Sequence, residues 1–389
     1  MTPNEQSISA ARKAAEQWAT RDTPFIFDEW YVLGFSHEFE RTLVKRTVLG
    51  RDLVFFRTEG GTPAAFDDRC VHRSYPLSRG TLDGDTLVCG YHGFRYNAEG
   101  NVVEVPSQKS CPKGLGVHAY PLCEKGPLVW VWMGDPAEAD EGKIPDQSWL
   151  TSSDWVTNQG YMRMEANYVS LHENLLDLTH LSYVHAKSFG TPDYASAPYQ
   201  TTVEEGYFML ERHVIPTRLP PVWAKSTGLE DCANAARVAK SEFLSPALHE
   251  TTATFYDNDL PAESRPEFSA RTAHIITPES KTSTHYFVVD GRCFATDEDW
   301  ITDFMHEQLL VAFKEDIDAL EALEVTLENW NRPLYEFSVA SDHASISMRK
   351  YLKKRADASE VKLHRRLHEG CSVPPASLNQ HKEAGAAAK

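Results

Sequence analysis

Two short segments, each carrying one cysteine and one histidine, restrict the fold of this chain more than any other feature of its sequence. They are Cys70-Val71-His72 and Cys89-Gly90-Tyr91-His92, and Cys89 follows His72 by 17 positions. A Rieske [2Fe–2S] cluster needs two thiolates on one iron and two imidazoles on the other. Structural zinc uses the same residue types, but zinc fingers usually take both cysteines from one segment and both histidines from another. The mixed pairs therefore favour a Rieske cluster over zinc, with the ligands Cys70, His72, Cys89 and His92.

The region around these segments has the pattern of a small all-β domain. From Trp30 to about Pro136, short β-branched and aromatic runs alternate with Gly, Asp and Asn turns. Gly90 and Gly93 lack a Cβ and let backbone amides approach the cluster sulfurs. We therefore expect a Rieske domain over residues 30–136. An N-terminal helical segment (1–29, with its helix near 7–20) precedes it, and a linker near 135–145 follows it.

The rest of the chain is predicted to form a second domain over residues 149–370. Its patterned segments are a helical stretch near 170–184, strand-like runs near 206–214, 251–256, 271–276 and 284–289, and a long helix near 299–327. This mixture predicts an α+β fold with an antiparallel sheet. The tail, residues 371–389, is polar and Ala-rich and is expected to be flexible.

A second metal site is predicted in the helical stretch, where His180 and His185 lie five positions apart. Non-heme Fe(II) oxygenases bind iron with two histidines and one carboxylate and leave the other positions open. A regular helix of 3.6 residues per turn would place these side chains roughly 140° apart. Shared ligation therefore requires a π-type bulge or a break in the helix between them.

The third ligand is predicted to be Asp316 in the long helix. Its neighbours at three, four and seven positions are Phe313, Ala319, Ala312, Leu320, Leu309 and Leu323. All six are apolar, so Asp316 is expected to point into the core, where a carboxylate needs a metal or hydrogen-bonding partners. Glu315 and Asp318 have polar neighbours and were expected to be solvated.

Two residues before His180 are candidates for a supporting role. Asp177 lies three positions before it, on the same helical face, and either orients His180 or is a surface acid. Asn174 lies one turn further back and either holds the same site or is an exposed helix residue.

Composition excludes several classes of partner. The chain has 39 basic and 56 acidic residues and a net charge of −17. A nucleic-acid or anionic-membrane surface would need clustered Lys and Arg, so neither partner is expected. No apolar run is long enough to span a bilayer, and the N-terminus lacks a signal pattern, so a cytoplasmic location is expected. Five further cysteines show no metal spacing and suit a reducing compartment.

In combination these motifs resemble the oxygenase (α) subunits of Rieske non-heme iron oxygenases, in particular the group with vanillate O-demethylase, dicamba monooxygenase and phthalate dioxygenase. The matching segments are 174–180 with His185, 274–279, 284–287 and 314–316. The resemblance implies a Rieske domain followed by a helix-grip-like catalytic domain, in a homotrimer or a multiple of trimers. It also implies that Asp177 bridges His92 of one subunit and His180 of the next, and that His274 lines the substrate pocket.

The resemblance further implies a terminal oxygenase that uses dioxygen and a mononuclear Fe(II). Its electrons would come from NADH through a separate reductase with flavin and ferredoxin-type centres, since this chain has no ferredoxin run or dinucleotide fingerprint. The expected reaction is O-demethylation or hydroxylation of an aromatic acid or aryl ether. The alternatives are a ring cis-dihydroxylating dioxygenase and, from another class, a Rieske electron-transfer protein without oxygenase activity.

Overall fold

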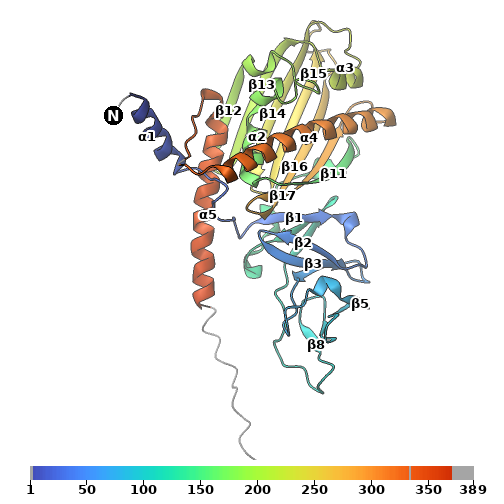
Figure 1. The fold of residues 1–389 in the computed structure, drawn as a ribbon. Helices are drawn as coiled ribbons and strands as arrows, with labels where there is room; N and C mark the ends of the chain where they lie inside the picture. The colour runs from blue at the N-terminus through green and yellow to red at the C-terminus, as the bar shows by residue number, and fades with distance from the viewer. Residues whose placement is uncertain (1–2, 333, 370–389) are drawn as a thin grey trace, which may run out of the picture.

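The computed structural model describes residues 3–332 and 334–369 and shows a small β-rich part beside a larger sheet crossed by helices (Figure 1). The α+β organisation with antiparallel sheets expected from the sequence is confirmed. The tail predicted over residues 371–389 lies outside the described residues.

The N-terminal helix, α1, lies earlier in the chain than predicted and spans Pro3–Ala15. Proline is well tolerated in the first turn of a helix, where its missing N–H has no partner to lose. After Ala15 the chain turns so that Trp18 is buried and the Ala19 N–H donates to the Arg349 carbonyl at 3.0 Å. This docking onto the C-terminal part of the chain ends the helix before residue 20.

The β-rich part contains three small antiparallel sheets. The strands are β1 (Trp30–Phe35), β10 (Leu128–Trp132) and β9 (Leu122–Lys125) in the first sheet, β2 (Val44–Val48), β3 (Arg51–Arg57) and β4 (Pro63–Asp67) in the second, and β5 (Thr81–Asp83), β6 (Thr86–Val88), β7 (Arg95–Tyr96) and β8 (Val102–Glu104) in the third. The first cysteine–histidine segment follows β4, and the second connects β6 to β7. Both segments are therefore loops held by rigid strands.

The larger part is built on one seven-stranded antiparallel sheet in the order β11-β17-β16-β15-β14-β13-β12. The strands are β11 (Val156–Met164), β12 (Tyr199–Glu204), β13 (Tyr207–Thr217), β14 (Ala235–Ser245), β15 (Leu248–Asp257), β16 (Phe268–Ser280) and β17 (Ser283–Arg292). The helices are α2 (Tyr168–Leu176), α3 (Pro221–Thr227), α4 (Asp299–Asn329) and α5 (His343–Glu369). Short 3-10 helices span Ser36–Glu38, Leu77–Arg79, Pro136–Glu138, Glu141–Lys143, Ser148–Thr151, Leu178–Ser182, Tyr194–Ser196 and Ala340–Asp342.

Helix α4 lies across one face of this sheet (Figure 1). Its apolar residues recur every three or four positions, which places them on one side of the helix. The buried stripe consists of Ile301, Met305, Leu309, Phe313, Ile317 and Leu320. Phe313 contacts the ring of Tyr286 on β17 and the ring of His274 on β16, at centroid distances of 5.9 and 5.7 Å. These contacts fix the rotation of α4 and thereby the direction of Asp316.

Helix α5 and strand β14 were not among the predicted elements. In α5 the buried residues Ala344, Met348, Leu352 and Ala356 repeat every four positions, a period that indicates one helical face. The sequence of β14, from Ala235 to Ser245, contains three alanines and alternates poorly, so its strand propensity is low. Pairing with β13 and β15 on both sides overrides that propensity.

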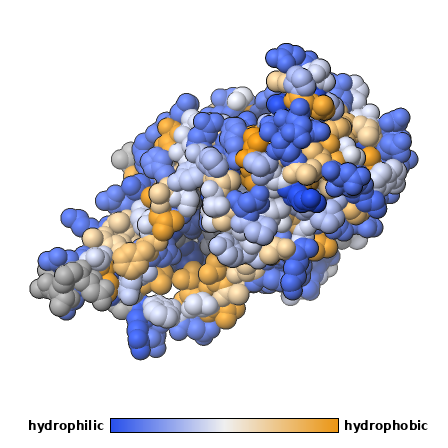
Figure 2. All heavy atoms as spheres, turned by 90° about the horizontal axis from the view of Figure 1, so that it is seen from above, coloured by the Kyte–Doolittle hydropathy of each residue, from blue (hydrophilic) through white to orange (hydrophobic). Residues whose placement is uncertain are grey.

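The surface carries mainly hydrophilic residues. On the face shown in Figure 2, hydrophobic residues form small separate patches among them. Among residues 3–332 and 334–369, no helix is long and apolar enough to cross a membrane.

Arg46 of β2 connects the two parts of the molecule. Its guanidinium lies over the rings of Tyr161 on β11 and Phe287 on β17, with the Cζ atom 5.4 and 5.2 Å from the ring centroids. Within its own part, Arg46 forms an ion pair with Glu38 at 2.8 Å. Its side chain is only 9% exposed, so these cation–π contacts are largely desolvated and correspondingly strong.

We expect the Arg46→Ala variant to lower the free energy of unfolding by about 2–4 kcal/mol, since it removes a desolvated ion pair and contacts to two aromatic rings. Calorimetric unfolding measures this change and shows whether the two parts still unfold together. Arg41→Ala is the matched control, because Arg41 pairs with Asp85 while its side chain is 41% exposed. Equal stability of the two variants would show that Arg46 does not hold the two parts together.

Candidate metal centres

The two cysteine–histidine loops have the same backbone conformation. The Cys70 N–H donates to the Tyr75 carbonyl and the Cys89 N–H to the Phe94 carbonyl, both at 2.8 Å. In each loop the residue four positions after the cysteine, Ser74 or Gly93, donates back to the cysteine carbonyl and has a positive φ, 55° and 73° respectively. The two segments are therefore equivalent turns, as a pair of loops holding one cluster requires.

The loops place their thiols inside and their imidazoles outside. Cys70 and Cys89 are each 2% exposed, and neither forms a disulfide. His72 and His92 are exposed, with ring centroids 4.5 Å apart. Two adjacent thiols and two adjacent imidazoles fit the two irons of a Rieske cluster.

Hydrogen-bond donors surround the two sulfurs. The Tyr96 hydroxyl donates to the Cys70 sulfur at 3.1 Å. The backbone amides of Tyr91 and His92 donate to the Cys89 sulfur. Such donors stabilise thiolate charge, and hydrogen bonds to sulfur are one of the factors that set the potential of an iron–sulfur centre. The two donating amides lie between Gly90 and Gly93, while the Gly93 N–H itself donates to the Cys89 carbonyl.

The helical stretch that carries the second histidine pair is interrupted. Helix α2 ends at Leu176, Asp177 follows as a cap, and a 3-10 helix runs over Leu178–Ser182. A turn then carries His185. The single helix predicted over 170–184 is therefore wrong after Leu176, and of the two alternatives the chain adopts the break. The break brings the two imidazoles together, with their ring centroids 5.2 Å apart.

Asp316 completes a compact set of three side chains. Its Oδ1 atom lies 3.4 Å from His180 Nε2 and 3.1 Å from His185 Nε2. One ligand atom from each of the three residues lies within 4.8 Å of the others. Asn174 Nδ2 donates to the same Oδ1 at 3.0 Å, so Asn174 holds the carboxylate in place. This donor set, two imidazoles and one carboxylate, is that of mononuclear non-heme iron.

The environment of Asp316 keeps the carboxylate ionised. The residue is 6% exposed. Burial alone raises the pKa of Asp316, but the hydrogen bonds from His180 and His185 outweigh it and hold the pKa below the ordinary value. An ionised, buried carboxylate between two imidazoles suits a divalent cation.

The Nδ1 atoms of His180 and His185 are each hydrogen-bonded to a neighbouring oxygen, and this directs their Nε2 atoms toward Asp316. His180 Nδ1 hydrogen-bonds the Asp177 carbonyl oxygen. His185 Nδ1 lies 2.8 Å from Glu315 Oε2, which also accepts from the Ser188 hydroxyl at 2.6 Å. When a metal replaces the Nε2 proton that faces Asp316, an imidazole that donates through Nδ1 presents its Nε2 lone pair to that metal.

The expectation that Glu315 is solvated was wrong, because Glu315 orients His185. Helix periodicity compares Glu315 only with residues of its own helix, and its partner comes from a turn about 130 positions earlier. Asp318 is exposed, as expected, and pairs with Lys314. Asp177 is half-buried and acts locally through its carbonyl on His180, while its side chain accepts from the Thr179 N–H at 2.9 Å.

His180, His185 and Asp316 lie in the wall of a mainly apolar cavity of about 90 Å³. This volume is below the roughly 300 Å³ of ordinary ligand pockets, so it favours a small substrate. His274 of β16, which the family resemblance implies as a pocket residue, lies in the same wall. Its Nε2 is 3.0 Å from the Thr251 hydroxyl and its Nδ1 is 2.5 Å from the Tyr286 hydroxyl. Burial lowers the pKa of His274 to about 3, so the ring is neutral.

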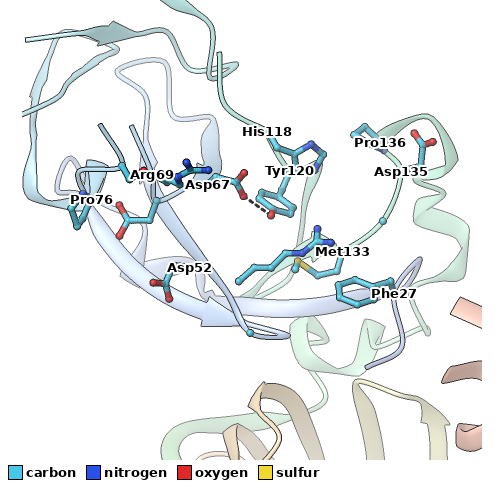
Figure 3. Close-up of a pocket in the computed structure, with 15 residues that line it drawn as sticks. Phe27, Asp52, Asp67, Arg69, Pro76, His118, Tyr120, Met133, Asp135 and Pro136 are labelled. Atoms are coloured by element: carbon cyan, nitrogen blue, oxygen red, sulfur yellow. Dashed lines mark hydrogen bonds between the residues drawn. The ribbon is translucent and has the colours of Figure 1, made fainter. Parts of the chain in front are cut away.

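A larger and more open hollow of about 830 Å³ lies on the β-rich part (Figure 3). Asp52, Asp67, Arg69, His118 and Tyr120 are among its lining residues, and the Tyr120 hydroxyl donates to Asp67 at 2.7 Å. None of the seven predicted metal ligands lines it. The smaller cavity is therefore the candidate active site, because it contains the three converging ligands.

Two families account for most of the chain. Residues 29–121 match the Rieske [2Fe-2S] domain, and residues 164–358 match the vanillate O-demethylase oxygenase C-terminal domain. The resemblance inferred from the motifs is confirmed by these matches. The two iron centres expected from the motifs are those of this family.

Several characterised proteins are similar over most of their length. The iron-sulfur subunit of the toluene-4-sulfonate monooxygenase system of Comamonas testosteroni is 32% identical over 85% of this chain and 96% of its own. The dicamba O-demethylase oxygenase component of Stenotrophomonas maltophilia is 31% identical over 77% and 88%. A crystal structure of dicamba monooxygenase bound to 3,6-dichlorosalicylic acid superposes with a TM-score of 0.81 at 27% identity, covering 87% of this chain and 99% of that one.

We expect Asp316→Ala to remove the mononuclear iron and leave the cluster, since the two sites are built from separate segments of the chain. Total iron should fall from about three to about two atoms per chain, with acid-labile sulfide and the visible spectrum unchanged. Metal and sulfide analysis after anaerobic iron loading measures this. The control is Asp318→Ala, an exposed acid of the same helix, which should keep all the iron. Full iron retention in Asp316→Ala would exclude Asp316 as a ligand.

Proposed function

Because this chain belongs to the Rieske non-heme iron oxygenases of the vanillate O-demethylase type, we propose that it is the terminal oxygenase that acts on an aromatic acid or aryl ether by O-demethylation or hydroxylation. The observation that carries this proposal is the convergence of His180, His185 and Asp316 in the wall of a mainly apolar cavity. A Rieske electron carrier has no need of such a site.

We assign the cluster to Cys70, His72, Cys89 and His92, and the mononuclear iron to His180, His185 and Asp316. When bound, the two groups supply one-electron transfer and dioxygen activation. The protein provides their ligands and the surroundings that orient them. Asn174, Glu315 and the Asp177 carbonyl form hydrogen bonds to the three proposed ligands of the mononuclear site and orient them.

The cavity wall determines what can approach the site. Apolar side chains exclude water and offer contacts to a flat ring; they include Leu175, Leu178, Phe189, Trp223, Leu309 and Phe313. We propose that His274 of the cavity wall contacts the substrate. Its neutral ring and its two hydrogen-bonded nitrogens suit a polar or stacking contact and not an ion pair.

Electrons are proposed to reach the iron site from the cluster of a neighbouring subunit in a homotrimer or a multiple of trimers. In one chain the strands β5 and β8 beside the cluster loops are separated from α2 by the strands β1, β2 and β3 (Figure 1). Both centres also carry an exposed tyrosine, Tyr91 at 59% and Tyr183 at 75% exposure, which an intersubunit contact would cover. Asp177 is the proposed bridge between His92 of one subunit and His180 of the next.

The primary electrons are proposed to come from NADH through a separate reductase with flavin and ferredoxin-type centres, because this chain has no nucleotide fingerprint of its own. A cytoplasmic setting is consistent with its cysteines. The described part of the chain contains six of the cysteines, and none of these six forms a disulfide.

The decisive experiment supplies electrons from a heterologous NADH-dependent reductase and measures dioxygen uptake, formaldehyde and product mass with 4-methoxybenzoate and 4-methylbenzoate. We expect substrate-dependent uptake. Formaldehyde identifies O-demethylation, and a mass gain of one oxygen identifies hydroxylation. Products with two added oxygens on the ring would instead show a cis-dihydroxylating dioxygenase. Protein with both centres loaded and reducible that consumes no dioxygen with any aromatic acid or ether would exclude the proposal.

We expect Asp177→Ala to keep its iron and its colour while substrate oxidation falls by about 100-fold or more, because the bridge between the centres is lost. Asp177→Asn is the control for folding, since an amide oxygen can still accept from the Thr179 N–H. Stopped-flow reoxidation of the reduced cluster measures the electron transfer itself. Unchanged turnover in both variants would remove the bridging role.

A further inference from the structure

Arg237 of β14 is a buried cation in the wall of the active-site cavity. The residue is 3% exposed. Its Cζ atom lies 4.8 Å from the ring centroid of Tyr194, 5.7 Å from that of Phe189 and 5.9 Å from that of Trp223. The guanidinium is therefore enclosed by aromatic rings, in surroundings where an uncompensated charge is costly.

The guanidinium of Arg237 is poorly satisfied. Its Nη1 donates to the Phe189 carbonyl at 2.7 Å, while its buried Nε has no hydrogen-bond partner. Within the described part of the chain it forms no ion pair, and the nearest influence of a carboxylate comes from Asp193, which is exposed. Burial lowers the pKa of Arg237 from the ordinary value for arginine, which reflects the cost of holding this charge without a counter-ion.

Two other buried arginines show what a structural role looks like here. Arg212 and Arg292 also lack a carboxylate partner in the described residues. In the part of the chain that the structure describes, their Nε atoms, like that of Arg237, have no hydrogen-bond partner. Through its Nη atoms, however, each donates to three backbone carbonyls and one threonine hydroxyl. Neither of them lines the cavity. Arg237, which does line it, makes one such bond, so its guanidinium is the least satisfied of the three.

No other group in the cavity wall supplies a free positive charge for a ligand. Lys240 lies in the same wall but is paired with Glu242 at 2.7 Å. His274 is neutral, and both of its nitrogens are occupied. The remaining imidazoles, His180 and His185, belong to the metal site.

We propose that Arg237 binds an anionic group of the substrate, a carboxylate or a sulfonate, and so selects aromatic acids over neutral aromatics. This inference rests on the proposed function. The planar guanidinium matches such an anion through two parallel hydrogen bonds, and the apolar surroundings strengthen the attraction.

The geometry also gives the orientation of the substrate. The Phe189 ring stacks on His185, with centroids 4.8 Å apart and an interplanar angle of 10°, and it also contacts Arg237 and the ring of Trp223. A single ring therefore separates the cation from the metal site. A monocyclic substrate whose anion is bound by Arg237 extends its opposite edge, carrying the methyl or methoxy group, toward the triad.

The test measures equilibrium binding without turnover. Anaerobic calorimetric titration of the holoprotein with oxidised cluster uses 4-methoxybenzoate, toluene-4-sulfonate and the neutral 4-methoxybenzamide. We expect wild-type protein to bind at least one anion about 10-fold or more tighter than the amide, and the ratio between the two anions tells carboxylate from sulfonate. In Arg237→Gln that anion should bind about 10- to 100-fold more weakly, with the amide little changed. Arg237→Lys should recover part of the loss.

Two controls separate ligand binding from folding. Lys240→Gln removes a positive charge from the same wall and should keep the preference for anions. Arg237→Gln should keep the cluster spectrum and unfold at the same temperature as wild type or higher, because it removes a buried charge that has no partner. A marked loss of stability in Arg237→Gln, together with an unchanged preference for anions in that same variant, would indicate a structural role and overturn the inference.

The two proposals fail in distinguishable ways. If wild type binds anions through Arg237 but the reductase-driven assay detects no oxidation, the proposed function fails and the binding site stands. If aromatic substrates are oxidised while anion and amide bind equally in wild type and in Arg237→Gln, the inference about Arg237 is wrong and the oxygenase stands.

Discussion

The buried carboxylate of Asp316 is the constraint on which the arrangement of the catalytic part depends. A carboxylate on the apolar side of α4 requires donors, and the structure supplies three, from His180, His185 and Asn174. All three come from the segment that begins in α2 and continues through the turn after it. The carboxylate of Asp316 can therefore be buried because three features occur together. They are the helix break at Asp177, the packing of α4 on the sheet and the apolar cavity next to the metal site.

The features that the sequence could predict depend on short spacings between residues or on helical periodicity. The cluster loops are complete within about 25 residues, so their ligand set is visible in the chain, and the apolar period of α4 was sufficient to identify Asp316 as buried. The i, i+5 spacing of the two histidines required an irregular backbone. It did not tell a bulge from a break, because the choice depends on how Asp177 caps both helices and on what packs around them.

What the sequence could not predict depends on contacts between distant segments. Glu315 reaches His185 and Arg237 reaches the carbonyl of Phe189 only after β14, α4 and the turn near 185 are assembled. An arginine in a strand sequence is ordinarily exposed, so nothing local distinguishes Arg237 from a surface residue. The three buried arginines of the sheet differ in their hydrogen-bond partners, and no property of the neighbouring sequence records those partners.

His72 and His92 are exposed, whereas Cys70 and Cys89 are buried. A cluster held by these four residues would therefore be accessible from its histidine side. Electron tunnelling falls steeply with distance. A cluster held by these residues would therefore exchange electrons through its imidazole side, because the protein behind the thiolates keeps any partner further away. A redox partner would therefore need only shallow contact with the tip of the loops.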